Sequence, residues 1–182
     1  MATFHTNADG LVERYGQVTT TDAPYARSID SGLGGTLVVD FDFSDLNVSG
    51  GVATFWTEDA SGGETPDVPS SLNASIPSGS YIKSAHLLVS TGFVGATGTL
   101  TIGLYEKDGT AIDVDGIDAA IAVTALNAAN DAVACDGALV NGVVSGVSGG
   151  TGDTGMYVGA FSATADFTAG AARLIVEYVH NR

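Results

Sequence analysis

The sequence predicts a mainly all-β protein: an antiparallel β-sandwich, with a jelly roll as the expected topology, and one short helix near residues 116–130. Three observations lead to this fold class. Glycine is abundant, at 25 of 182 residues, and proline is scarce at 4, which is typical of short strands joined by tight turns. Hydrophobic residues make up 45% of the chain, enough to bury a core at this length. Several segments alternate between apolar and polar residues, which is the period of a half-buried strand.

The chain divides into two parts by composition. Residues 1–35 are mixed and polar and end in a glycine-rich stretch at 32–35 (GLGG). We interpret them as an N-terminal arm, either extended or packed as a loose edge. Residues 36–182 hold the regular apolar patterns, so they are predicted to form a single β-sandwich domain.

The first strands of this domain are predicted at 36–43 (TLVVDFDF) and 52–56 (VATFW). In the first of them, alternation places four apolar residues on one buried face. These residues are Leu37, Val39, Phe41 and Phe43. Residues 57–75 are polar and contain two prolines, so they are predicted to be a loop.

The middle of the chain is the most regular part. A strand is predicted at 81–90 (YIKSAHLLVS), a glycine-rich connection at 92–98, and a strand at 99–106 (TLTIGLYE). Asp108-Gly109 is predicted to make a tight hairpin turn because glycine tolerates positive φ, and 110–114 is the short return strand. One face of the strand at 81–90 is expected to carry Ile82, Ser84, His86, Leu88 and Ser90.

The period changes in residues 116–130 (GIDAAIAVTALNAAN). Ile117, Ile121 and Ala125 are four residues apart and alanine is dense, which predicts a helix. Further strands are expected near 138–147, 155–162 and 171–179, with a loop at 145–155.

The predicted total of about eight strands and one helix indicates two packed antiparallel sheets. No solenoid repeat interrupts this pattern.

Three aspartates near the predicted helix nearly match a calcium loop. Asp113, Asp115 and Asp118 follow the pattern D-x-D-G-x-D. An EF-hand loop also needs an oxygen ligand at position 5 and a glutamate at position 12, where this chain has Ile117 and Thr124. The sequence therefore favours local roles, in which Asp115 caps the helix and Asp118 lies in its first turn. An irregular calcium site is the alternative, and no other metal or cofactor is predicted.

The charge of the chain limits its partners. Six Lys and Arg stand against 21 Asp and Glu, a formal net charge of −15. Proteins that bind nucleic acid neutralise phosphates with Lys and Arg, so neither nucleic acid nor an anionic membrane is expected as a partner. No run reaches the roughly 18 apolar residues of a membrane span, and no apolar signal core is present at the N-terminus, so synthesis in the cytoplasm is expected. Cys135 is the lone cysteine, predicted to be a small buried residue or an unreactive thiol.

Two short motifs suggest catalysis but lack the context that catalysis needs. Residues 146–150 (GVSGG) match the nucleophile elbow G-x-S-x-G around Ser148, and residues 150–155 match G-x-G-x-x-G. The first must join a strand to a helix, and the second needs a helix N-terminus for phosphate. Neither context is predicted, so the sequence indicates a protein without catalytic function, and an esterase built on Ser148 ranks as a third hypothesis.

Residues 76–126 carry a resemblance to a known family. They contain an IP-x-G-x-x-I-x-S-A strand, then TL-x-IGL, then DGT-x-ID-x-DGI-x-A. This block resembles virion structural proteins of tailed bacteriophages. The resemblance implies a jelly-roll core and a capsid decoration (cement) protein that binds the major capsid protein shell on the outer surface of the virion. It also implies a homo-oligomer, with a trimer as the expected state, and it supplies no catalytic residue.

The arm holds the candidate partner contacts. Its four acids and two arginines give it a net charge of −2, against −13 for the rest of the chain. It is therefore the part least repelled by an acidic capsid surface or an acidic sister subunit. Arginine forks pair with carboxylates, and tyrosines bury area while keeping a polar tip. We predict that Arg14, Tyr15, Tyr25 and Arg27 contact the partner. The alternative is an arm that only covers its own sheet edge.

A second function hypothesis comes from the aromatic residues. A carbohydrate-binding or adhesion module on a virion or cell surface would need rings on which sugars stack. The candidates for this role are Trp56, Tyr81, Tyr105 and Tyr157.

Overall fold

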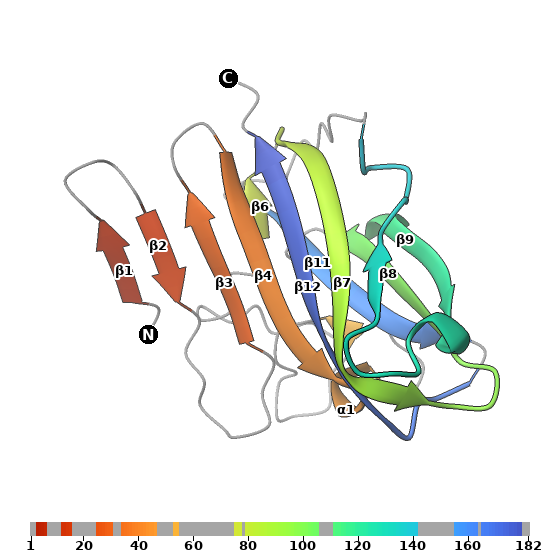
Figure 1. The fold of residues 1–182 in the computed structure, drawn as a ribbon. Helices are drawn as coiled ribbons and strands as arrows, with labels where there is room; N and C mark the ends of the chain where they lie inside the picture. The colour runs from red at the N-terminus through yellow and green to blue at the C-terminus, as the bar shows by residue number, and fades with distance from the viewer. Residues whose placement is uncertain are drawn as a thin grey trace, which may run out of the picture.

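A computed structural model of the chain describes residues 3–6, 12–15, 25–30, 34–46, 53–54, 75–77, 79–105, 111–141, 155–163 and 165–179. Within these residues, two antiparallel sheets pack against each other around one core (Figure 1). The predicted mainly-β sandwich is therefore confirmed.

The larger sheet has seven strands. Their order is β1 (Thr3–Thr6), β2 (Val12–Tyr15), β3 (Tyr25–Asp30), β4 (Gly34–Asp42), β12 (Ala169–Val179), β7 (Tyr81–Val94) and β10 (Ala132–Ala134). Residues 1–35, predicted as an arm or a loose edge, thus supply β1–β3 at one edge of this sheet.

The smaller sheet has five strands. Along its path they are β5 (Ala53–Thr54), β11 (Gly155–Ala163), β8 (Thr99–Tyr105) and β9 (Ala111–Ala122), and β6 (Ser75–Pro77) also pairs with β11. The described helices are short: α1 (Phe43–Leu46) follows β4, and a 3-10 turn (Val123–Ala125) follows β9. Phe43, predicted as the end of the first strand, therefore begins α1.

Four strand pairs are nested inside one another along the chain. In the larger sheet β4 pairs with β12, and β7 pairs with β10. In the smaller sheet β5 pairs with β11, and β8 pairs with β9. From the outermost pair to the innermost, successive pairs alternate between the two sheets.

The core lies between the sheets and follows strand alternation. Leu37, Val39 and Phe41 of β4 are buried as predicted. They meet the alternate residues of β12, β7, β8 and β11, which are also buried. These residues are Leu174, Val176, Ala85, Leu87, Val89, Leu100, Ile102, Leu104, Met156, Val158 and Ala160. Burial of this apolar surface is the main driving force for the fold.

The face predicted for residues 81–90 is correct from Ser84 onward and wrong at Ile82. Glu177 lies opposite Ser84, whereas Tyr178 lies opposite Ile82, so Lys83 is an extra residue in β7. Such a bulge shifts the alternation by one position. Ile82 is therefore buried, while His86 and the other predicted members of the face, Ser84, Leu88 and Ser90, lie on the outer side.

The helix predicted over residues 116–130 is wrong. Residues 111–122 form β9, which pairs with β8, and only one 3-10 turn follows. Ile117 and Ile121 are both buried in this strand, and β9 has a register shift between Asp118 and Ile121, so its alternation is not regular here. The alanine-rich composition is only a weak preference, and pairing with β8 overrides it.

Other boundaries differ from the prediction. The strand at 81–90 runs on to Val94, and the return strand runs to Ala122. The strand expected near 138–147 is absent from its described part, where Val140 makes one isolated bridge to Ile82 and β10 lies earlier in the chain. Tyr105 pairs with Ala111 across the predicted hairpin, but Asp108-Gly109 lies outside the described residues.

Phe93 anchors one end of the core. Its ring centroid lies 5.1 Å from that of Phe167, in an edge-to-face arrangement, and 6.4 Å from that of Phe41. Gly170 has a φ of +133°, and a Cβ there would lie 2.3 Å from a ring carbon of Phe93. The chain therefore needs glycine at this position so that β12 can begin directly against the aromatic cluster.

Replacing Phe93 by alanine should lower the free energy of unfolding by about 3–5 kcal/mol, because it leaves a cavity in a packed core. Urea unfolding followed by circular dichroism measures this loss. Val94→Ala is the matched control, because Val94 is the next residue of β7 and is 57% exposed; its cost should stay within about 0.5 kcal/mol. Equal losses for the two variants would contradict the described packing.

Candidate functional site on the outer face of the larger sheet

The residues that alternate with the core form the outer face of the larger sheet. We define this outer face by three positions on each of its central strands. They are Thr36, Val38 and Asp40 of β4; Arg173, Ile175 and Glu177 of β12; and Ser84, His86 and Leu88 of β7. All of them are half-buried or exposed.

The strand register arranges these residues in three rows across the sheet. Arg173 lies between Asp40 and Leu88 in one row. The central row contains Val38, Ile175 and His86. The third row contains Thr36, Glu177 and Ser84. Because cross-strand neighbours on one face contact each other, the apolar pair Val38 and Ile175 lies beside His86 in the central row and between two rows that contain charged side chains.

One polar row holds a forked ion pair. Arg173 Nε donates to Asp40 Oδ1 at 2.6 Å, and Nη2 donates to Oδ2 at 2.9 Å. The two side chains are 53% and 36% exposed, and an exposed pair contributes roughly 0–1 kcal/mol to stability. The pair therefore contributes little to stability, and it joins the side chains of two neighbouring strands, β12 and β4.

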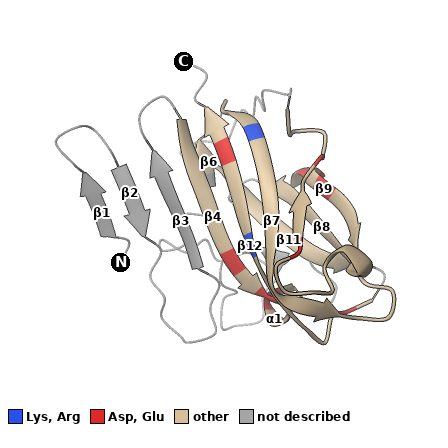
Figure 2. Cartoon of the chain, viewed as in Figure 1, with Lys and Arg blue, Asp and Glu red and all other residues tan. Residues whose placement is uncertain are grey.

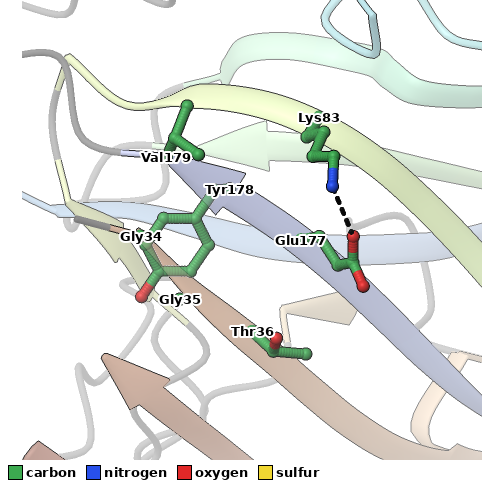
Figure 3. A pocket seen from close by; sticks show the side chains of 7 residues that line it. All are labelled: Gly34, Gly35, Thr36, Lys83, Glu177, Tyr178 and Val179. Atoms are coloured by element: carbon green, nitrogen blue, oxygen red, sulfur yellow. Dashed lines mark ion pairs between the residues drawn. The ribbon is translucent and has the colours of Figure 1, made fainter. Parts of the chain in front are cut away.

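The other polar row holds a second ion pair, shown in Figure 3. Lys83 Nζ lies 3.7 Å from Glu177 Oε2, and Ser84 Oγ donates to the same oxygen at 3.2 Å. The pair borders an open cavity of about 350 Å³ where β4 begins and β12 ends. The cavity is lined by Gly34, Gly35, Thr36, Lys83, Glu177, Tyr178 and Val179.

The charges of the described residues are distributed unevenly (Figure 2). Lys83 and Arg173 are the Lys and Arg residues whose side chains the structure describes, and each pairs with an acid of the outer face. The face is thus electrically balanced in a chain whose net charge is −15. By contrast, β9 and the segment that follows it carry aspartates only among their charged residues. These aspartates are Asp113, Asp115, Asp118, Asp131 and Asp136.

Backbone register places three of the four predicted contact residues in line with the outer face. Tyr15 lies opposite Arg27, and Arg27 lies opposite Val38 of the central row. Tyr25 lies opposite Asp40. Arg14 belongs to a different row, because it lies opposite Ser28, which in turn lies opposite the buried Leu37. The register therefore brings Tyr15, Tyr25 and Arg27 together and separates them from Arg14.

The three candidate calcium ligands do not come together. The Asp115 N–H donates to Asp113 Oδ1 at 3.4 Å. Burial, followed by a side-chain hydrogen bond with Asp115, raises the pKa of Asp113, whereas this backbone hydrogen bond acts in the opposite direction. Asp118 is buried farther along β9. No group of three His, Cys, Asp or Glu in the described part of the chain is placed to hold a metal ion. Asp115 also caps no helix, because β9 continues through it.

Asp118 is buried beside Cys135 and Asp136, and is 5% exposed. Burial is the main cause that raises its pKa, and the charge of Asp136 adds to it, whereas hydrogen bonds from the Cys135 thiol and the backbone act in the opposite direction. Burial and the charge of Asp118 raise the pKa of Cys135 to about 12. The thiol is therefore protonated at neutral pH and lacks the thiolate that reactive cysteines need.

The aromatic residues considered for sugar stacking do not form one surface. Tyr105 is buried, so its ring cannot stack on a sugar; burial and then the charges of Asp115 and Asp113 raise its pKa to about 12. Tyr81 belongs to β7 and Tyr157 to β11, which lie in different sheets. Trp56 and the motifs around Ser148 lie outside the described residues.

Comparisons with protein-family models, with curated proteins and with solved structures found no match to this chain. Among the described residues, no helix has the length and apolar character needed to cross a membrane.

Sequence reasoning missed both ion pairs of the outer face. Arg173 and Asp40 are 133 residues apart, and nothing local links them. The alternation of Arg173, Ile175 and Glu177 in the last strand was the available signal, since it marks a polar face with an apolar centre.

Replacing Asp118 by asparagine should change how stability depends on pH. Because the pKa of Asp118 is raised in the folded state, the folded protein binds this proton more tightly than the unfolded chain, and stability falls as pH rises from about 4 toward neutral. The variant lacks this loss. Its free energy of unfolding relative to the wild type should therefore increase between pH 4 and pH 7, as measured by urea unfolding.

The matched control for this experiment is Asp166→Asn, at an exposed position. It should give a difference from the wild type that changes less with pH. A pH-independent difference for Asp118→Asn would contradict the described burial.

Proposed function

We propose that this protein is a non-enzymatic capsid decoration protein of a tailed phage, which binds and stabilises the shell of the major capsid protein on the outer surface of the virion. The observation that carries the proposal is the nested strand pairing. The resemblance of residues 76–126 to virion structural proteins also supports the proposal.

The nested pairing supports the finer interpretation of the sandwich as a jelly roll. A jelly roll contains eight strands in two sheets and is built from two Greek keys. Folding a ribbon of four antiparallel pairs gives that arrangement when successive pairs alternate between sheets. The pairs β4·β12, β5·β11, β7·β10 and β8·β9 have this order. Viral capsid domains are one of the main classes that use this topology.

The shape of the larger sheet also fits a role in binding. Strands β1–β3 continue this sheet past the smaller one (Figure 1). A free sheet edge presents unpaired backbone groups that can pair with another chain. A protein that binds the assembled shell, and not its unfolded subunits, stabilises the shell by mass action. We propose that strands β1–β3 bind the shell, because they contain the predicted contact residues.

A carbohydrate-binding or adhesion module is the second candidate, because lectin domains also use jelly rolls. The open cavity beside Lys83 and Glu177 favours it, since this pair offers donors and acceptors for sugar hydroxyls. A glycan array with no binding at high protein concentration would count against this function.

Electron microscopy of purified virions tests the leading proposal directly. Density for this chain on the outside of the capsid supports it. Virions that carry the chain nowhere on the particle would exclude it.

The double substitution Tyr25→Ala with Arg27→Glu should weaken binding to undecorated heads at least about tenfold, which corresponds to about 1.4 kcal/mol. The reason is that the predicted contact would lose the area that the tyrosine ring buries against the shell and would have one charge reversed. Co-sedimentation with heads measures the affinity, and circular dichroism checks the fold. Lys107→Glu is the control, because it reverses a cation outside the arm and should bind normally. Unchanged affinity of a folded double variant would contradict the predicted contact.

A further inference from the structure

Residues 135–141 cross between the two sheets at one side of the sandwich, and we name this segment the clasp. It follows β10, and its Cys135 N–H donates to Ala85 O of β7, in the larger sheet, at 2.9 Å. At its other end the Asn141 N–H donates to Ile82 O of the same strand at 3.2 Å. The clasp therefore covers a part of β7 that β10 leaves unpaired on this side.

Between these two bonds the clasp pairs with β9, which lies at one end of the described order of the smaller sheet. The Gly137 N–H donates to Ile117 O at 2.9 Å, and the Leu139 N–H donates to Gly116 O at 2.8 Å. A Cβ at Gly137 would lie 2.5 Å from Gly116 O, so the close approach of the two backbones requires glycine there. The clasp thus joins an edge of one sheet to the other sheet.

Asp118 links β9 to the clasp through its side chain. Its carboxylate accepts hydrogen bonds from the Cys135 thiol and the Asp136 N–H, and from the adjacent Ala119 N–H. Asp118 is 5% exposed and Cys135 is 6% exposed, so this contact is shielded from water. One buried carboxylate therefore holds two consecutive residues of the clasp.

We propose that the clasp opens as a local unit while the two sheets stay paired, and that ionisation of Asp118 loosens it. Four described backbone hydrogen bonds hold the clasp to the sheets, whereas β12 pairs with β4 along nine residues. Its residues Asp136, Ala138 and Asn141 are exposed. Segments with few buried contacts open at a lower free energy than core strands.

The groups around Asp118 explain why its ionisation weakens the clasp. Asp136 is the charged group that acts on it, and Asp136 has the same sign. The Cys135 thiol is neutral, and the residue opposite Asp118 on β8 is Ile102. The Lys and Arg side chains that the structure describes pair with acids of the outer face instead. A buried carboxylate beside a like charge is costly in its ionised form.

The direction of the pH effect follows from this cost. In the closed clasp, burial and then the charge of Asp136 raise the pKa of Asp118. The closed state therefore binds the proton more tightly than the open state, in which water surrounds the carboxyl group. Opening becomes more favourable as pH rises from about 4 toward neutral. An open clasp leaves the carbonyl groups of Ile82 and Ala85 at a sheet edge, where another strand can pair with them.

Reaction of Cys135 with dipyridyl disulfide measures the opening, because Cys135 is the lone cysteine of the chain and is buried in the closed clasp. Its thiolate attacks one sulfur of the reagent, a mixed disulfide forms, and pyridinethione leaves after taking up a proton. The rate, measured where it is proportional to reagent concentration, is divided by the rate for glutathione at the same pH. This ratio removes the intrinsic reactivity of a thiol, and it should rise at least about threefold from pH 4 to pH 7.

Asp118→Asn is the decisive variant, because the amide keeps the shape of the side chain and cannot ionise. Its ratio should stay constant with pH. Asp136→Asn should give a smaller rise than the wild type, because it removes the like charge. Asp166→Asn, at an exposed position, is the matched control and should keep the full rise. Circular dichroism establishes that each variant is folded.

Urea separates local opening from unfolding of the whole chain. Local opening exposes little surface, so the reaction rate should hardly change at low urea, whereas a rate that depends on global unfolding rises steeply. Cys135→Ala combined with Ala160→Cys provides the reference, because Ala160 is fully buried in β11. This double variant should react more slowly than the wild type and with a steep dependence on urea.

Two results overturn the proposal. A wild type that reacts as slowly and as steeply with urea as the Ala160→Cys chain would show that the clasp does not open alone. A ratio that stays constant with pH in the wild type, or that rises equally in Asp118→Asn, would show that ionisation of Asp118 does not loosen the clasp. The experiment contains no capsid, so its outcome is independent of the proposed binding to phage heads.

Discussion

The structure depends on the placement of β12 between β4 and β7 in the larger sheet. This last described strand pairs along nine residues with β4 and along most of its length with β7. Its inward residues, including Leu174 and Val176, are fully buried, and its outward residues form the centre of the outer face. The core cannot close before β12 is in place. Because β4 and β12 lie near opposite ends of the sequence of the sandwich domain, their pairing is long-range and is expected to form slowly compared with local contacts.

Local periodicity was enough to predict the fold class and much of the core. Leu37, Val39 and Phe41 are buried as their alternation predicts, since a regular strand has only two faces. Prediction failed where the period was ambiguous or interrupted. The spacing of Ile117 and Ile121 fits a helix and a strand equally well, and the bulge at Lys83 shifts Ile82 to the buried face. The sequence predicted the hairpin between β8 and the start of β9, but neither the continuation of β9 to Ala122 nor the position of a bulge is encoded in a local pattern.

The candidate site was less predictable than the fold, because it depends on register between distant strands. Tyr15, Tyr25 and Arg27 were selected by charge and residue type, and the register then places them in line with Val38 and Asp40. The same register assigns Arg14 to another row, which composition could not show. The ion pair of Arg173 with Asp40 likewise requires knowledge of which strands are neighbours.

The ion pairs of the outer face also act on the register that creates them. A slip of β12 by one residue would turn Leu174 and Val176 to solvent and bury Arg173 and Glu177. Moving these charges into the apolar core, away from their present partners, would cost several kcal/mol each, in addition to the lost apolar burial. The alternation of charged and apolar residues in β12 therefore disfavours the slipped pairing on both faces of the sheet, because one face would lose apolar burial and the other would bury charges. Burial of the core residues of β12 thus also determines which residues of this strand lie on the outer face. A partner that binds this face therefore contacts residues whose positions are set by folding.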